Sequence, residues 1–87
     1  MCVLTRDAAI PVLVAVTCAP ITRTIRGIRS EVQVGRPEGL RAKSAISCDN
    51  LVTIPVDLFD REPVGRLGVV ARRRLDRALR YALDLRY

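Results

Sequence analysis

The chain has 87 residues, of which 49% are hydrophobic, and this combination predicts a single globular domain, residues 1–87, and excludes a disordered chain. Lysine and arginine outnumber aspartate and glutamate by 15 to 9, so the net charge of +6 favours an anionic partner, either a nucleic acid or an acidic protein. Ordinary solvated arginines are the alternative explanation. One phenylalanine, two tyrosines and no tryptophan argue against a single-strand binder that stacks bases on exposed rings.

Cysteine and histidine usage argues against the common metal sites and against a disulfide framework. The chain contains no histidine, and its three cysteines are widely spaced without a Cys-x-x-Cys pair. Cys18 and Cys48 lie in apolar runs, so we expect them to be small core residues. No signal peptide or membrane-spanning run is visible, and we therefore expect a cytoplasmic protein with no membrane partner.

The first predicted elements are strands. Residues 1–5 are typical of the end of a strand. Residues 12–18 form an unbroken run of small and β-branched side chains, which predicts a strand buried on both faces. Residues 28–34 alternate, with Ile28, Val32 and Val34 on one side, which predicts a strand with one wet face. We expect these two longer strands to form a hairpin.

The loop inside this predicted hairpin is cationic. Thr22 and Thr24 contribute two hydroxyls and Arg23 and Arg26 two guanidiniums, and the loop has no acidic residue. Such a loop is suited to bind a phosphate, because hydroxyls and guanidiniums both donate hydrogen bonds to phosphate oxygens. A solvated turn that the Thr22 hydroxyl caps is the alternative.

The rest of the chain predicts shorter strands and one helix. Residues 35–43 are a loop, residues 44–48 a strand, Asp49 and Asn50 a turn, residues 51–56 a strand, and residues 63–67 one more short strand.

Beyond Gly68, apolar residues recur at helical spacing: Ala71, Leu75, Ala78, Leu79, Ala82 and Leu83. Arg72 to Arg74 lie in the first turns of this helix, where the dipole disfavours cations by roughly 0.3–1 kcal/mol each. Exposed arginines bear little of this cost in salt, so solvated surface charge explains them, and a binding role is the alternative.

Four segments in this order resemble the MazF/PemK toxins of toxin–antitoxin modules, and together they span Val3 to Leu85. They are VLTRD, AVTCAPITRTIRGIRSEV, AISCDNLVTIP and the basic amphipathic C-terminal helix. The most specific parts are Ala19-Pro20-Ile21-Thr22 and Asp49-Asn50-Leu51. The resemblance implies an all-β fold, a small SH3-like barrel that is shortened at its N-terminus, with a C-terminal α-helix.

The resemblance also implies a function. It is that of a metal-independent, sequence-specific endoribonuclease without a cofactor, which cleaves single-stranded messenger, ribosomal or transfer RNA and is neutralised by a cognate MazE-like antitoxin. We expect a homodimer, and an acidic, partly disordered antitoxin segment that folds onto the Arg23–Arg29 side. In this family pattern Thr22 is catalytic. The RNA-binding positions are Arg23, Thr24, Arg26, Asp49 and Asn50, although an Asx turn explains the last two equally well.

One part of the family pattern falls outside this sequence. In the family, the strand that matches Val3 opens with an Arg-Pro pair, which would lie ahead of Met1, and that arginine is the second catalytic group. Arg6 cannot replace it, because it lies at the other end of the same strand. Two alternatives therefore stay open: a catalytically impaired or truncated relative that binds antitoxin without cleaving RNA, and a non-catalytic barrel that binds nucleic acid.

Overall fold

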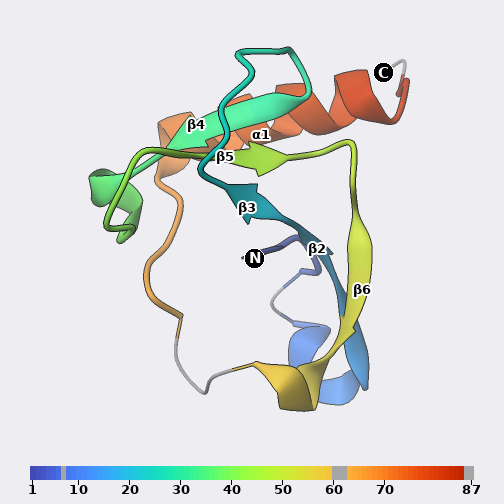
Figure 1. Cartoon of the computed structure of the whole chain (residues 1–87). Helices are drawn as coiled ribbons and strands as arrows, with labels where there is room; N and C mark the ends of the chain where they lie inside the picture. Colours follow the sequence, from blue (N-terminus) through green and yellow to red (C-terminus); the bar gives the residue numbers. More distant parts are fainter. Residues whose placement is uncertain (7, 60–62, 86–87) are drawn as a thin grey trace.

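The computed structural model describes residues 1–6, 8–59 and 63–85, which form two small β-sheets and one long helix (Figure 1). The strands are β1 (Cys2–Val3), β2 (Ala15–Ala19), β3 (Ile21–Thr22), β4 (Glu31–Val34), β5 (Ser44–Ser47) and β6 (Val52–Pro55). The 3-10 turns η1 (Ile10–Val12), η2 (Arg36–Glu38) and η3 (Val56–Leu58) lie between strands or next to them, and helix α1 (Val69–Ala82) comes last. Within these ranges, no helix has both the length and the apolar character needed to cross a bilayer.

The first sheet has the strand order β1–β2–β6 and the second has the order β3–β5–β4, with all neighbours antiparallel. β5 is central in the second sheet, so its Ile46 lies opposite both Ile21 and Val32. The chain passes from the first sheet to the second at Pro20. Proline has no N–H to donate to a ladder, but the Pro20 carbonyl accepts a hydrogen bond from the N–H of Ser47 at 2.8 Å. This bond anchors the crossing point to the end of β5.

The predicted hairpin between residues 12–18 and 28–34 is wrong. β2 belongs to the first sheet, whereas β4 pairs with β5 in the second. The arrangement places β5 between β3 and β4 and buries Ile46 completely, and this long-range packing outweighs the local pairing that a hairpin would provide. Residues 23–30 consequently form a long loop, which we call the β3–β4 loop, rather than a tight turn.

Two predictions of burial are also wrong. Residues 12–18 are not one strand with two buried faces, because η1 and a short irregular stretch come before β2. The side chains of Val12 and Val14 are 80% and 87% exposed as a result. Ile28 is exposed as well, since the regular strand begins only at Glu31.

The core lies between the second sheet and α1, which runs alongside β4 (Figure 1). Its buried members are Ala19, Val32, Val34, Ile46, Cys48 and Ala78. Cys18 and Cys48 are 0% and 1% exposed, which confirms the prediction that they are core residues. Leu75 and Leu79 of the predicted helical stripe pack against this core, whereas Leu83 is half exposed.

The later part of the chain follows the sequence-based prediction with one exception. The loop at residues 35–43, the strands β5 and β6, the turn between them and the helix after Gly68 are all confirmed. The predicted strand at residues 63–67 is wrong, because these residues are irregular. The backbone of Gly65 lies directly against that of Glu38, so this segment crosses the β4–β5 loop instead of pairing with a sheet.

Candidate functional site

A hollow of about 320 Å³ opens where β3 and the β3–β4 loop meet the end of β5. Its lining includes five of the six site residues expected from the family pattern: Thr22, Thr24, Arg26, Asp49 and Asn50. Pro20, Ile28, Glu31 and Ser47 complete the lining, and we call the whole the Thr22 hollow. Arg23 is exposed and lies outside this lining. The fold thus brings together residues that are up to thirty positions apart in the sequence, because β3 pairs with β5.

The hydroxyl of Thr22 is oriented by its own turn. Thr22 is half-buried at the end of β3, and its Oγ1 accepts a hydrogen bond from the N–H of Thr24 at 3.1 Å. The capping contact suggested as an alternative role is therefore present. It does not compete with a phosphate, because a hydroxyl that accepts one hydrogen bond still has its own proton to donate.

Glu31 holds the β3–β4 loop in place. Its Oε1 accepts hydrogen bonds from the backbone N–H groups of Arg26 and Gly27, at 2.9 and 3.2 Å. Gly27 has a φ of +69°, a left-handed conformation that glycine adopts without strain. Sequence reasoning placed Glu31 on a wet strand face and missed this role. The signal available was a carboxylate four residues after a glycine, at the start of a strand.

Asp49 and Asn50 are fixed by serine side chains. The Ser30 hydroxyl donates to Oδ2 of Asp49 at 2.5 Å, and the Ser30 carbonyl accepts from the N–H of Cys48 at 2.9 Å. Ser30 itself is only 2% exposed. The side-chain amide of Asn50 donates to Oγ of Ser47 at 3.2 Å. The turn after β5 is therefore attached to the end of the β3–β4 loop, and both border the hollow.

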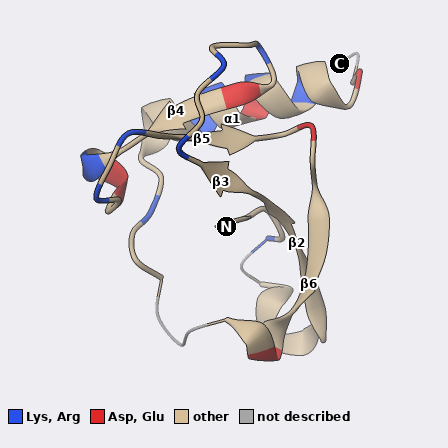
Figure 2. Ribbon diagram, in the orientation of Figure 1, with Lys and Arg blue, Asp and Glu red and all other residues tan. Residues whose placement is uncertain are grey.

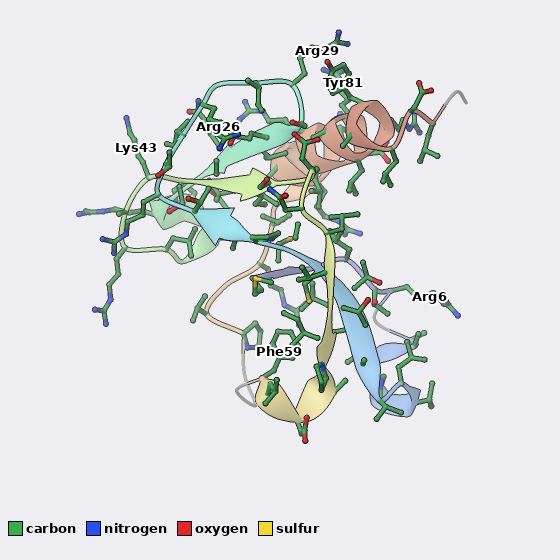
Figure 3. The ribbon with its side chains drawn as sticks, turned by 45° about the vertical axis from the view of Figure 1, so that its right-hand side comes forward. Arg6, Arg26, Arg29, Lys43, Phe59 and Tyr81 are labelled. Atoms are coloured by element: carbon green, nitrogen blue, oxygen red, sulfur yellow. The ribbon has the colours of Figure 1, made fainter. Side chains whose placement is uncertain are left out.

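Charge in the Thr22 hollow is not predominantly positive. Its lining contains one cation, Arg26, and two carboxylates, Glu31 and Asp49. Arg6 lies beside β2 and points away from this region, as Figure 3 shows. Arg29 leaves the loop in another direction and stacks over the ring of Tyr81, 4.4 Å from its centroid (Figure 3). This cation–π contact ties the end of the loop to α1.

The cysteine next to the turn is not a nucleophile at neutral pH. Burial raises the pKa of the Cys48 thiol to about 11, and burial also raises the pKa values of Cys2 and Cys18. A thiol of this kind stays protonated near pH 7, and only the thiolate is strongly nucleophilic. The chemistry available at the hollow is therefore that of a hydroxyl, a guanidinium and two carboxylates.

Comparison with known proteins identifies close relatives, although no family model matches the chain. The chain is 43% identical over 83 residues to endoribonuclease MazF3 of Mycobacterium tuberculosis, an alignment that covers 95% of this chain and 80% of the relative. It is 39% identical over 84 residues to the probable endoribonuclease MazF5 of the same species, covering 94% of this chain and 75% of that protein.

Solved structures resemble the whole fold. The Mycobacterium tuberculosis toxin MazF-mt6 superposes with a TM-score of 0.92 and 42% sequence identity, over 99% of this chain and 86% of that one. A mycobacterial endoribonuclease solved with its cognate antitoxin gives a TM-score of 0.84 at 22% identity, over 98% of this chain and 80% of that one, which is a likeness of fold. The predicted fold class, a small mostly-β barrel with a C-terminal helix, is confirmed.

Proposed function

This chain belongs to the MazF family of endoribonucleases, and we propose that it acts on single-stranded RNA at the Thr22 hollow. The observation that carries this proposal is the convergence of Thr22, Arg26 and the Asp49–Asn50 turn on one opening, although they come from separate elements. The substrate class is RNA with a preferred cleavage sequence, and we place the activity in the cytoplasm.

The proposed cleavage has three chemical tasks. The ribose 2′-hydroxyl loses its proton as its oxygen attacks the adjacent phosphorus, charge builds up on the phosphorane-like transition state, and the leaving 5′-oxygen takes up one proton, so the number of protons is unchanged overall. The attack forms the bond from phosphorus to the 2′-oxygen and breaks the bond to the 5′-oxygen, leaving a 2′,3′-cyclic phosphate and a 5′-hydroxyl.

In this proposal Thr22 donates its hydroxyl proton in a hydrogen bond to a non-bridging phosphate oxygen. The guanidinium of Arg26 offsets the developing negative charge from the same hollow. Thr24, Asp49 and Asn50 contact the nucleotides on either side of the cleaved bond. Arg23, exposed beside the hollow, tracks the RNA backbone.

We propose two protein partners as well. The first is a second copy of this chain, since Val12, Val14 and Leu58 leave large apolar side chains exposed around η1 and η3. A stable monomer in sedimentation at micromolar concentration would contradict this. The second is an acidic antitoxin segment over the β3–β4 loop. Charge reversal at Arg23 and Arg26 should weaken that complex, and an unchanged affinity would rule out this surface.

The experiment that tests the catalytic proposal replaces the Thr22 hydroxyl with a methyl group. Thr22→Val keeps the side-chain shape, and loss of one preorganised donor typically lowers the rate by about 10²–10³. The assay follows cleavage of a long unstructured RNA with a chelator present. Thr22→Ser should recover most of the rate, because it restores the hydroxyl.

The matched control is Thr53→Val, the same change at an exposed position on β6 in the other sheet. It should cleave RNA as the wild type does. If Thr22→Val retains the wild-type rate, the active site lies elsewhere. If the wild type itself leaves RNA intact but binds an acidic antitoxin segment, the non-catalytic alternative is correct.

A further inference from the structure

A second hollow, of about 630 Å³, lies at the beginning of β5. Four cations line it: Arg36, Arg41, Lys43 and Arg74. The single acidic residue of the lining is Glu38, whose Oε1 accepts a hydrogen bond from the N–H of Gly35 at 2.7 Å. We call this the basic hollow. Figure 2 shows basic residues gathered around η2 and along the connection that leads into β5.

The two hollows differ in charge in a way that suggests separate tasks. The basic hollow has four cations against one carboxylate, whereas the Thr22 hollow has one cation against two carboxylates. A polyanion is attracted to the surface where cations are concentrated. The Thr22 hollow alone therefore has the groups for contact at one phosphate but not the charge to hold a long strand.

The two hollows share one wall and one strand. Thr24 and Arg26 of the β3–β4 loop line the Thr22 hollow, while Ile25 between them lines the basic hollow. β5 runs from the basic hollow at Ser44 to the Thr22 hollow at Ser47, a span of about 10 Å at ~3.4 Å per residue. In Figure 3 Lys43 projects outward at the start of this strand. A strand of RNA that leaves one hollow can thus reach the other within a few nucleotides.

Arg74 connects the basic hollow with an unexplained feature of the sequence. Arg72, Arg73 and Arg74 all lie in the first turns of α1, where the helix dipole is unfavourable for cations. Of the three, only Arg74 belongs to the lining of the basic hollow. Arg74 therefore adds a cation to the basic hollow despite the unfavourable position in the helix.

We propose that the basic hollow binds the phosphodiester backbone of the RNA segment that flanks the cleaved bond. This inference rests on the proposed function, because it requires RNA in the Thr22 hollow. The four cations contact backbone phosphates, and the exposed side chain of Ile25 provides an apolar surface for ribose or base. The basic hollow interacts with the charge of the RNA backbone and does not distinguish between bases.

The test compares two RNA lengths and two double variants. Both oligonucleotides carry a mapped cleavage site with a 2′-deoxy nucleotide at the attacking position, and the long one extends about ten nucleotides further on each side. Arg41→Gln with Arg74→Gln removes two cations from the basic hollow. The matched control, Arg73→Gln with Arg77→Gln, removes two exposed cations of α1 outside both linings. Fluorescence anisotropy gives the affinities as a function of salt.

We expect the wild type to bind the long RNA more tightly than the short one. In the basic-hollow variant, the ratio of the two affinities should fall by about tenfold. The slope of log K against log salt for the long RNA should fall by about 1.4, since each lost phosphate contact removes roughly 0.7. The control should keep the wild-type ratio and slope.

Three results would overturn the inference. An unchanged long-to-short ratio in the basic-hollow variant would do so, and so would an equal loss in the control. If poly-glutamate binding, rather than RNA binding, depends on Arg41 and Arg74, the hollow serves an acidic protein segment instead. Failure of the proposed function appears separately, in the cleavage assay on all-ribose RNA, as a wild type that leaves the RNA intact or whose cleavage survives Thr22→Val.

Discussion

The backbones of Gly39 and Gly65 cross so closely that neither residue has room for a side chain. A Cβ at Gly39 would lie 3.0 Å from the Cα of Gly65 and would overlap the carbonyl oxygen of Val64. A Cβ at Gly65 would overlap the carbonyl oxygen of Glu38. This crossing fixes the β4–β5 loop, which carries most of the basic hollow, against the segment that leads into α1.

We therefore expect Gly65→Ala to lower the free energy of unfolding by about 1–3 kcal/mol, because backbone must move to admit the methyl group. Gly39→Ala should cost more, since its φ of +93° adds strain to the overlap. Urea unfolding measures both. Gly35→Ala is the control, as its Cβ would meet only the Cα of Lys43 at 3.9 Å. Equal stability of all three variants would contradict this account of the crossing.

Removal of the Glu31 carboxylate should loosen the β3–β4 loop without unfolding the domain. Glu31→Ala deletes the acceptor for the N–H groups of Arg26 and Gly27. Hydrogen bonds to a charged group contribute about 1.5–3 kcal/mol, so exchange of these two amide protons should accelerate by roughly tenfold or more. Glu31→Gln, which keeps a carbonyl oxygen, should show a smaller effect.

The measurement is amide hydrogen exchange by NMR, with the N–H of Cys48 as an internal reference, because its bond to the Ser30 carbonyl does not involve Glu31. Cleavage of RNA by Glu31→Ala should fall as well, since the loop carries Thr24 and Arg26 into the Thr22 hollow. Exchange that stays at the wild-type rate at Arg26 and Gly27 would show that other contacts hold the loop.

Local patterns predicted the second half of the fold well. The helix after Gly68, the loop at residues 35–43 and the turn at Asp49 and Asn50 follow from periodicity and turn chemistry, which depend on neighbours in sequence. The hairpin failed because strand partners are chosen by long-range packing. Nothing local to residues 28–34 shows that β5 lies between β3 and β4 and buries Ile46.

The candidate site was predictable to the extent that a sequence motif marks it. The family pattern pointed to Thr22 and to the Asp49–Asn50 turn, and the fold brings them to one hollow. Glu31 was missed because its bonds to backbone N–H groups depend on the path of the β3–β4 loop, which strand alternation does not describe. The basic hollow was missed for a related reason, since its cations come from η2, the β4–β5 loop and α1.

The buried cysteines make the stability of the fold sensitive to alkaline pH. The Cys48 thiol has a folded pKa raised from 9.0 to about 11 by burial. Above pH 9 the unfolded chain therefore loses this proton before the folded chain does, and the free energy of unfolding falls as pH rises towards 11. A pKa shift of this size corresponds to a loss of about 2–3 kcal/mol in the free energy of unfolding over that window, with no change below pH 8.

Denaturant unfolding between pH 7 and 11 measures the loss, and Cys48→Ala isolates it from other titrating groups. The variant should be less stable at pH 7, because it loses buried volume, but its stability should fall less steeply above pH 9. Parallel curves for the variant and the wild type would show that Cys48 does not cause the decline.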